Sequence, residues 1–97
     1  MKFQIKLVKN ANKDLNFYNN FDQKIIVKAI NEYLQRNANI ETRKRKRLRP
    51  NPFAPWELKI GKYRIFYEIV ENETVRVLAI GHKEYNDLFI QGKKVEI

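Results

Sequence analysis

The chain has 97 residues, of which 20 are Lys or Arg and 11 are Asp or Glu, so its formal charge is +9. With 43% hydrophobic residues, this length predicts one globular domain over residues 1–97 with a single modest core. The absence of cysteine excludes disulfides and thiolate metal sites, and a single histidine supplies too few ligands for a typical transition-metal site. No apolar run is long enough to span a membrane. We therefore expect a cytoplasmic protein without metal or cofactor, whose charge favours polyanionic partners.

The first third of the chain predicts one strand followed by two helices. Residues 2–8 alternate charged and apolar side chains, which indicates a strand and not a signal peptide. Apolar residues at helical spacing then predict a short helix capped by Asn10 or Asn12. Asp22 suits the N-cap of a longer helix, whose buried stripe ends at Leu34. The two helices are expected to form a hairpin that covers a sheet.

A basic segment follows the helices, because six of the seven residues from Arg43 to Arg49 carry a positive charge. Such a block repels itself and stays solvated unless an anion gathers it. Two interpretations are open. The segment binds a phosphate backbone or the acidic face of a partner, or it is a mobile loop without a fixed target. The prolines that follow stiffen the chain, so the next strand should begin at about Trp56. The basic residues are Arg43, Lys44, Arg45, Lys46, Arg47 and Arg49.

The second half of the chain predicts consecutive antiparallel strands. Residues 56–60 alternate apolar and charged side chains, and residues 63–70 are rich in aromatic and β-branched residues. Gly61-Lys62 suits a two-residue hairpin turn between them. After a polar break, a third strand runs from residue 75 to about residue 83, and residues 88–90 form a later extended segment. The order predicts an α+β fold, with an N-terminal strand, a two-helix hairpin and an antiparallel sheet of three to four strands with the helices on one face.

Strand register predicts which side chains share a face of this sheet. With turns at Gly61-Lys62 and Asn72-Glu73, Arg64 faces Lys59 on one side and Gly81 on the other. One face then collects Glu57, Lys59, Arg64, Glu68 and Lys83, with Phe66, Val77 and Ala79 between them. The other face, the expected core, carries Trp56, Leu58, Ile60, Tyr63, Ile65, Tyr67, Ile69, Leu78, Ile80 and His82.

The charged face is either an ordinary solvated surface or a phosphate-binding surface. In the second interpretation, the missing side chain of Gly81 leaves room for a ligand beside the cations.

This element order resembles the RelE/ParE family of bacterial toxins from toxin–antitoxin modules. The resemblance covers nearly the whole chain and is sharpest over residues 58–83, where residues 63–67 read Tyr-Arg-Ile-Phe-Tyr and residues 80–83 read Ile-Gly-His-Lys. It implies a RelE-like fold and a small basic protein that is neutralised by an antitoxin encoded beside it. RelE-like members cleave messenger RNA, typically in the ribosomal decoding site, whereas ParE-like members poison DNA gyrase and are not nucleases. Because both kinds share the fold, the fold does not decide between them.

For a nuclease, the resemblance implies a metal-independent attack of the ribose 2′-hydroxyl on the adjacent phosphorus. Arg64 matches the family's strand arginine and is expected to bind the phosphate, because a guanidinium can hold two of its oxygens. Lys83 lies where RelE-like members often carry a second cation, and Lys59 is the neighbour of Arg64 by register. His82 and Tyr85 are the candidates for proton transfer.

Three departures from the family pattern keep the alternatives open. Phe89 stands where RelE-like nucleases commonly have a tyrosine, and it cannot move a proton. Glu57 stands where some members have a lysine, although it could act as a base. The register also turns His82 toward the core beside Tyr63, which favours a structural role. We prefer a ribosome-dependent endoribonuclease; the alternatives are a gyrase inhibitor and a catalytically inactive basic binding module.

Overall fold

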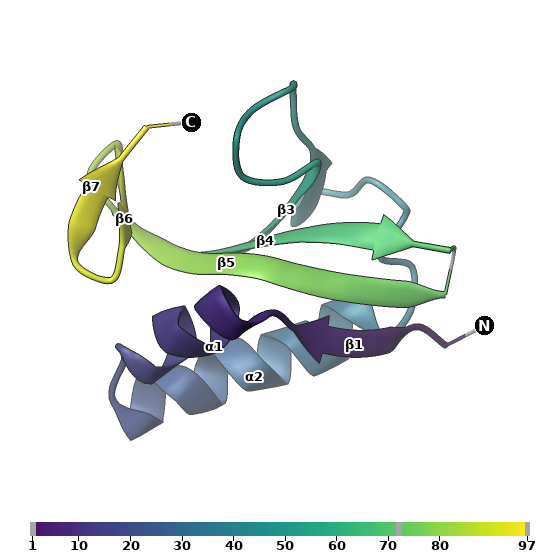
Figure 1. Cartoon of the computed structure of the whole chain (residues 1–97), viewed down its shortest axis with the longest axis horizontal. Coiled ribbons are helices and arrows are strands. Elements are labelled where there is room, and N and C mark those ends of the chain that lie inside the picture. Colours follow the sequence, from purple (N-terminus) through teal and green to yellow (C-terminus); the bar gives the residue numbers. More distant parts are fainter. Residues whose placement is uncertain (1, 72, 97) are drawn as a thin grey trace.

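The computed structural model describes residues 2–71 and 73–96. Within these residues, seven strands and two helices follow one another along the chain (Figure 1). The elements are β1 (Gln4–Leu7), α1 (Lys9–Asn16), α2 (Asn20–Leu34), β2 (Arg45–Arg47), β3 (Trp56–Ile60), β4 (Tyr63–Val70), β5 (Thr74–Glu84), β6 (Asp87–Ile90) and β7 (Lys93–Val95). The strands form one sheet in the order β2-β3-β4-β5-β6-β7, and β1 joins it by pairing in parallel with β5. The predicted α+β fold is therefore confirmed, although the sheet has more strands than expected.

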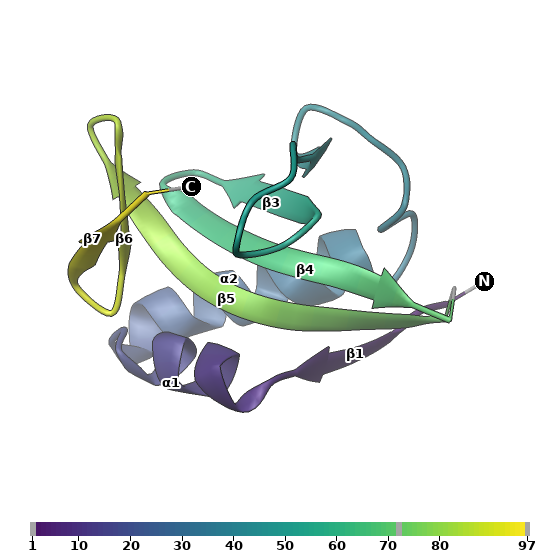
Figure 2. The same ribbon diagram turned by 45° about the horizontal axis from the view of Figure 1, so that its top comes forward.

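Both helices pack on the same face of the sheet (Figures 1 and 2), which confirms the predicted layers. The main core lies between these layers and joins Ile26, Ile30 and Leu34 of α2 to Leu58, Ile65 and Tyr67 of the sheet. A buried apolar contact of this kind contributes about 1.5–3 kcal/mol per large side chain, so the helices are held mainly by this stripe.

The helix caps differ from the predicted ones. Asn19 caps α2, because its side-chain oxygen accepts a hydrogen bond of 2.8 Å from the backbone nitrogen of Asp22. Asp22 therefore lies inside the first turn and is free to bond elsewhere. Val8 precedes α1 and supplies no side-chain cap, so Asn10 and Asn12 are not caps either.

One edge of β5 is shared between three elements. Strand β1 pairs with its first half at Thr74–Val77, and β6 pairs with its last residues from His82 onward. Between these stretches, the buried carboxylate of Asp14 from α1 accepts a hydrogen bond of 3.0 Å from the backbone nitrogen of Ile80. A buried backbone donor without a partner is costly, so Asp14 completes the sheet where no strand does.

The predicted register is correct throughout the β3–β4 pair and, in the β4–β5 pair, from Tyr63–His82 to Phe66–Ala79, whereas next to the β4–β5 turn it is wrong by one residue. Lys59 pairs with Arg64, Arg64 with Gly81, and Tyr63 with His82. The register then shifts at Phe66 and Tyr67, which pair with Ala79 and Val77 and leave Leu78 as an extra residue on β5. The predicted turn at Asn72-Glu73 includes Asn72, which lies outside the described residues.

This β-bulge corrects the predicted faces. Val77 belongs to the main core, whereas Leu78 packs in a second apolar cluster on the opposite face. The sequence expectation had placed the two residues the other way round, because it assumed an unbroken alternation along β5.

The basic segment is also ordered differently from the prediction. Residues 45–47 form β2, which pairs antiparallel with Trp56–Leu58, so this part is an edge strand and not a solvated loop. Strand β3 begins at Trp56, as the prolines before it predicted. In the described part of the chain, no helix is long and apolar enough to cross a membrane.

Candidate functional site

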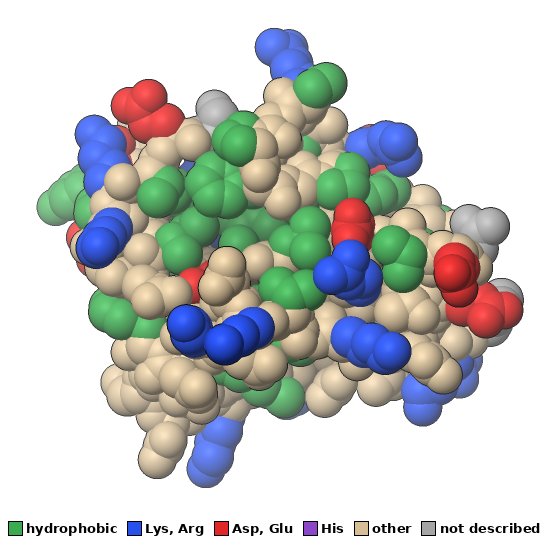
Figure 3. Space-filling view, viewed as in Figure 1, with side chains coloured by type: hydrophobic (Ala, Val, Ile, Leu, Met, Phe, Trp, Pro, Cys, Tyr) green, Lys and Arg blue, Asp and Glu red, His purple; other side chains and the backbone are tan. Residues whose placement is uncertain are grey.

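A groove crosses the face of the sheet that the helices leave free. Its floor and walls are the second apolar cluster, which joins the loop of residues 48–55, the middle of β4 and β5, and the β6–β7 hairpin. Figure 3 shows apolar side chains in this hollow, with Lys and Arg side chains around its rim. The cluster consists of Leu48, Phe53, Ala54, Phe66, Leu78, Ala79, Leu88, Ile90 and Val95. We call this surface the groove.

Arg64 lies on the groove side of β4, with only 7% of its surface exposed. Its Nη1 donates hydrogen bonds of 2.8 Å to the Gly61 carbonyl and 2.9 Å to the Tyr63 carbonyl. No buried side-chain nitrogen of the described residues lacks a partner, so Nε and Nη2, which donate no hydrogen bond to the protein, keep contact with solvent. Burial lowers the pKa of Arg64, and Glu57 acts in the opposite direction. The guanidinium is therefore fixed at one corner, and its other edge, formed by Nε and Nη2, keeps a narrow contact with solvent.

Glu57 lies beside this accessible edge. Its carboxylate oxygen Oε1 is 3.8 Å from Arg64 Nε, and both side chains are largely buried. By register, Lys46 is opposite Glu57 and Lys59 is opposite Arg64, and both lysines are exposed. Opposite residues on paired strands share a face, so one carboxylate stands among three cations. Such a set can bind an anion and offers a base next to the group that binds it.

Gly81 has a different role from the one predicted. A Cβ at this position would lie 2.4 Å from the Phe89 carbonyl oxygen and 2.9 Å from Ile90 Cγ1. The space beside Gly81 is therefore filled by β6, and the missing side chain allows the β6 backbone to approach. The expectation that it leaves room for a ligand is wrong.

His82 faces the helices, as the register predicted. Its Nδ1 is 2.7 Å from the Tyr18 hydroxyl oxygen, and Phe89 stacks on its ring at a centroid distance of 5.7 Å. Its Nε2 is 3.4 Å from Glu84 Oε1. Since Arg64 points to the other face of the sheet, neither His82 nor residue 89 lies beside it. Phe89, which replaces the family's tyrosine, therefore stacks on His82 on the helix-facing side of the sheet. A tyrosine at position 89 would have to leave this stack to reach the groove.

Tyr63 ties the turn beside Arg64 to the helical layer. Its hydroxyl donates a hydrogen bond of 2.5 Å to Asp22 Oδ1, and its ring meets Tyr18 edge to face. Burial, with the nearby Asp22 carboxylate, raises the pKa of Tyr63 to about 12, and burial also raises the pKa of Tyr18. Both phenols therefore remain neutral near pH 7 and serve as hydrogen-bonding groups, a role that the sequence alone did not indicate.

Arg45 is separated from the rest of the basic segment. Its side chain turns to the helical layer, where Nε donates to the Ile40 carbonyl at 3.0 Å and Nη1 to the Tyr33 carbonyl at 3.1 Å. Tyr33 lies in the last turn of α2, so Arg45 pairs with a carbonyl at the negative end of the helix. The prediction that Arg45 binds a phosphate or a partner is corrected to a structural role.

The other residues of the basic segment are exposed. Lys44 lies over the Tyr33 ring at 5.5 Å, and Arg47 lies over the Trp56 ring at 5.7 Å, so each charge is held near a fixed position. The exposed members are Arg43, Lys44, Lys46, Arg47 and Arg49.

Lys83 and Tyr85 lie at the end of β5. Lys83 is half-buried, and its backbone nitrogen donates a hydrogen bond of 2.8 Å to the Lys62 carbonyl, so the two turns at this end of the sheet adjoin. Tyr85 is fully exposed in the β5–β6 turn. At roughly 3.3 Å per strand residue, it is about 13 Å along β5 from Gly81, the partner of Arg64. Such a distance is too long for proton transfer at a phosphate on Arg64.

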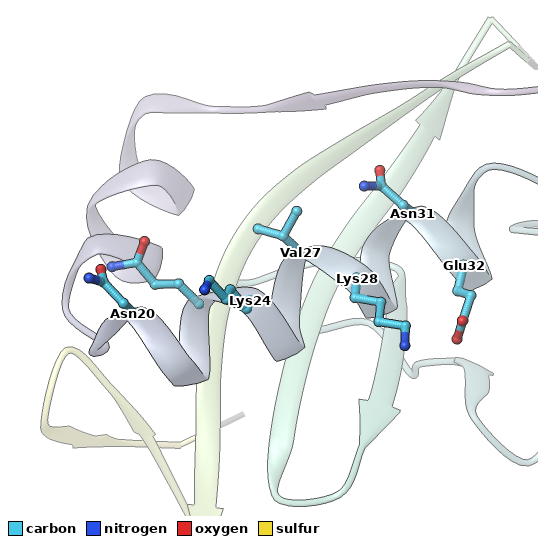
Figure 4. Close-up of a pocket in the computed structure, with 7 residues that line it drawn as sticks. Asn20, Lys24, Val27, Lys28, Asn31 and Glu32 are labelled. Carbon is cyan, nitrogen blue, oxygen red and sulfur yellow. The ribbon is translucent and has the colours of Figure 1, made fainter.

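A second depression, of about 770 Å³, lies along the outer side of α2. In Figure 4, Val27 and Asn31 point to one side of the helix, and Lys28 and Glu32 to the other. It is on the helical layer and contains no residue of the groove. No group of three or more His, Asp or Glu side chains in residues 2–71 and 73–96 is placed to hold a metal ion.

Comparisons with known proteins agree with this architecture. Residues 5–86 match the family model described as ParE toxin of type II toxin–antitoxin system, parDE. A chain of the RelBE2 toxin–antitoxin complex from Mycobacterium tuberculosis is similar in structure, with a TM-score of 0.70 and 24% sequence identity. The match covers 86% of this chain and 100% of that chain. A comparison with curated protein sequences found no match.

Proposed function

Because the chain belongs to the ParE toxin family of type II toxin–antitoxin systems, we propose that it stops growth by cutting messenger RNA in the groove. The observation that supports this proposal is the pair of Glu57 and Arg64, 3.8 Å apart on the free face of the sheet. A guanidinium that is anchored by two carbonyls and accessible along one edge is suited to a phosphate. A carboxylate beside it can accept a proton from a nucleophile on the same phosphate.

In the proposed reaction, the ribose 2′-oxygen attacks the adjacent phosphorus while the bond from phosphorus to the 5′-oxygen breaks. Glu57 accepts the proton of the 2′-hydroxyl, and Lys59 donates a proton to the leaving 5′-oxygen. Arg64 stabilises the negative charge on the equatorial oxygens through Nε and Nη2. The products are a 2′,3′-cyclic phosphate and a 5′-hydroxyl, so protons and bonds balance without a metal. His82 and Tyr85 take no part in these steps.

The substrate that we propose is messenger RNA on the ribosome, as the resemblance to RelE-like members implies. The formal charge of +9 and the exposed basic residues beside the groove support contact with ribosomal and messenger RNA phosphates. We also propose a cognate antitoxin as the protein partner, with an acidic binding segment that this charge attracts. Co-purification with the protein encoded beside this one tests the partner, and the absence of any complex would contradict it.

The function is tested by inducing the chain alone in a bacterium and mapping RNA 5′ ends across messages. We expect new ends inside translated frames, and we expect Arg64→Ala and Glu57→Gln to remove them. Arg76→Ala is the matched control, because Arg76 is an exposed arginine near the start of β5 that pairs with Glu68, five residues along the strand from Gly81, the partner of Arg64. Circular dichroism of each variant establishes that it is folded. Growth arrest by the wild type without new RNA ends would refute the proposal.

Gyrase inhibition is the second candidate, and two observations favour it. The matching family model is that of ParE toxins. In addition, the chain's single histidine lies on the helix-facing side of the sheet, so the groove lacks the imidazole that a nuclease commonly uses. This candidate predicts trapped gyrase–DNA complexes and a DNA-damage response on induction, with RNA ends unchanged.

A further inference from the structure

Tyr85 combines complete exposure with a backbone conformation that a tyrosine rarely adopts. Its φ is 57°, in the left-handed region where a side chain other than that of Gly, Asn or Asp is unfavourable. Its side chain is 100% exposed, so no residue among 2–71 and 73–96 covers it. The fold therefore gains no contact that offsets this conformation.

The neighbouring β3–β4 turn shows what this position normally requires. Both turns have two central residues, and in both only the first has a positive φ. In the β3–β4 turn that residue is Gly61, with a φ of 54°, which agrees with the preference of such turns for glycine. The β5–β6 turn adopts the same sign of φ with a tyrosine. Gln91 and Glu71 also have a positive φ in turns; Gln91 is compensated by a hydrogen bond of 2.6 Å to Asp14, and Glu71 carries a charge that is favourable in water. Strain that is not offset within the fold points to a function at that residue.

The surroundings of Tyr85 indicate what it contacts. Lys83 precedes it by two residues and places a cation on the groove face, because it follows Gly81 by two positions on β5. Lys62 is adjacent through its backbone, whereas its Nζ lies over the Tyr63 ring at 5.5 Å. Between Tyr85 and the groove, Lys83, Asn86 and Lys94 line a depression of about 350 Å³, which also includes the acidic Asp87 and Glu96. The tyrosine is about 13 Å along β5 from the partner of Arg64 at 3.3 Å per residue, within reach of the same extended strand of nucleotides.

We propose that Tyr85 is a stacking residue that binds one unpaired base of a single-stranded RNA whose backbone lies on Lys83 and Arg64. This inference rests on the proposed function and names the residue that contacts a base, whereas the groove contacts the phosphate. An aromatic ring on a projecting turn can stack on any base, because every base has a π-face. The turn holds the ring away from the protein, which keeps both of its faces free.

The experiment compares Tyr85→Gly and Tyr85→Phe with the wild type. The probe is a fluorescent single-stranded 2′-O-methyl RNA, which cannot be cut because its 2′-hydroxyl is blocked, and the affinity is measured by anisotropy over a range of salt concentrations. Tyr85→Gly is expected to weaken binding about five- to 150-fold, which is the ~1–3 kcal/mol of base–aromatic stacking at 1.4 kcal/mol per tenfold. Tyr85→Phe should bind like the wild type, because stacking does not need the hydroxyl.

Two further measurements separate stacking from other roles. The dependence of log Kd on log salt should be the same in all three proteins, because no cation is removed, whereas Lys83→Met should reduce that slope by about one. The melting temperature of Tyr85→Gly should equal or exceed that of the wild type, because glycine relieves the positive φ. A loss of binding therefore cannot be attributed to unfolding.

Several outcomes would overturn the inference. It fails if Tyr85→Gly binds RNA like the wild type, or if Tyr85→Phe is as weak as Tyr85→Gly, which would assign the role to the hydroxyl. It also fails if Tyr85→Gly abolishes growth arrest while RNA binding and RNA ends are unchanged, since Tyr85 would then contact a protein. If the wild type produces new RNA ends but the substitutions at Tyr85 leave the affinity for RNA unchanged, only this inference is refuted. If the wild type arrests growth without new RNA ends, the proposed function itself is refuted.

Discussion

Gly81 allows a direct test of whether the sheet beside Arg64 is closed by packing or open to a ligand. We consider Gly81→Ala, with Gly61→Ala as the matched control in the neighbouring turn. A Cβ on Gly81 would meet the Phe89 carbonyl oxygen at 2.4 Å, Ile90 Cγ1 at 2.9 Å and Leu88 Cδ1 at 3.3 Å. The nearest of these atoms belongs to the backbone, so it cannot rotate away as the end of a side chain can. Residue 61 has no atom within 4 Å of the added Cβ, and only its φ of 54° opposes the change.

The two substitutions should therefore differ in magnitude. Overpacking typically costs about 1–3 kcal/mol, and the backbone contact places Gly81→Ala at or above the upper end. For a domain of this size, each kcal/mol lowers the melting temperature by roughly 4–8 °C, so we expect a decrease of about 12–24 °C. Gly61→Ala should cost only about 1 kcal/mol, from the left-handed backbone.

Thermal unfolding followed by circular dichroism measures both variants against the wild type. Hydrogen exchange adds the location of the damage, which should concentrate in residues 87–95, because β6 must move away from β5 to make room. A Gly81→Ala protein that melts within a few degrees of the wild type would refute the packing argument. It would restore the expectation that this position faces open space.

Other substitutions test the groove and its support. Arg45→Met should destabilise the fold by roughly 2–3 kcal/mol, because the two carbonyls that accept hydrogen bonds from the Arg45 guanidinium in the wild type lose their donor. Lys46→Met is the matched variant: it should leave the melting temperature unchanged, and the protein should elute from a heparin column at a lower salt concentration. Glu57→Gln should tighten the binding of a non-cleavable RNA while abolishing cleavage, because it removes a negative charge 3.8 Å from Arg64 Nε; unchanged affinity would argue against anion binding at Arg64. Tyr63 should make stability fall as the pH rises from about 10, its ordinary pKa, to about 12, its raised pKa, because only the unfolded chain loses that proton in this window. Tyr63→Phe should reduce this alkaline loss in urea titrations at successive pH values, and an unaltered pH profile would refute the linkage.

The sequence predicts the parts of this molecule that depend on local alternation. Lys59 opposite Arg64 follows from the two-residue turn Gly61-Lys62, because the period of a strand leaves only one register once the turn is known. Tyr63 opposite His82 is predicted from a second turn at Asn72-Glu73; the pairs beside that turn are shifted by one residue, and the β-bulge restores the predicted pairing from Phe66 to Tyr63. The orientation of His82 toward the helices follows from the same count. These features needed no information from distant parts of the chain.

Features that depend on distant contacts could not be predicted in this way. Arg45 has the same local pattern as its basic neighbours, and it becomes structural only because the end of α2 offers it a carbonyl at Tyr33. Residue 81 must be glycine because the backbone of β6, which comes later in the chain, approaches it too closely for a Cβ. Asp14 is buried at a gap between two strands that adjoin it only after folding. Each of these assignments depends on a partner whose position is set by the complete fold.

The β-bulge gives the sharpest difference between the predicted register and the observed one, and deletion of Leu78 tests it. In the structure, Phe66 pairs with Ala79 and Tyr67 with Val77, so Leu78 is the extra residue. Removing it leaves every other residue of β5 on its observed face and costs only the burial of one half-exposed leucine. A fully buried leucine contributes about 1.5–3 kcal/mol, so the loss should be at most ~2 kcal/mol and the protein should remain folded.

The predicted regular register leads to the opposite result for the same deletion. Without a bulge, removing one residue would turn residues 74–77 over relative to residues 79–84, because a one-residue shift exchanges the two faces of a strand. Residues 74–77 form the whole pairing with β1, so such an exchange would break that pairing and unfold the chain. Deletion of Val75 is the control that should unfold the protein in either register, since it displaces the pairing with β1. A Leu78 deletion that abolishes cooperative unfolding would contradict the bulge, and with it the placement of Leu78 in the groove.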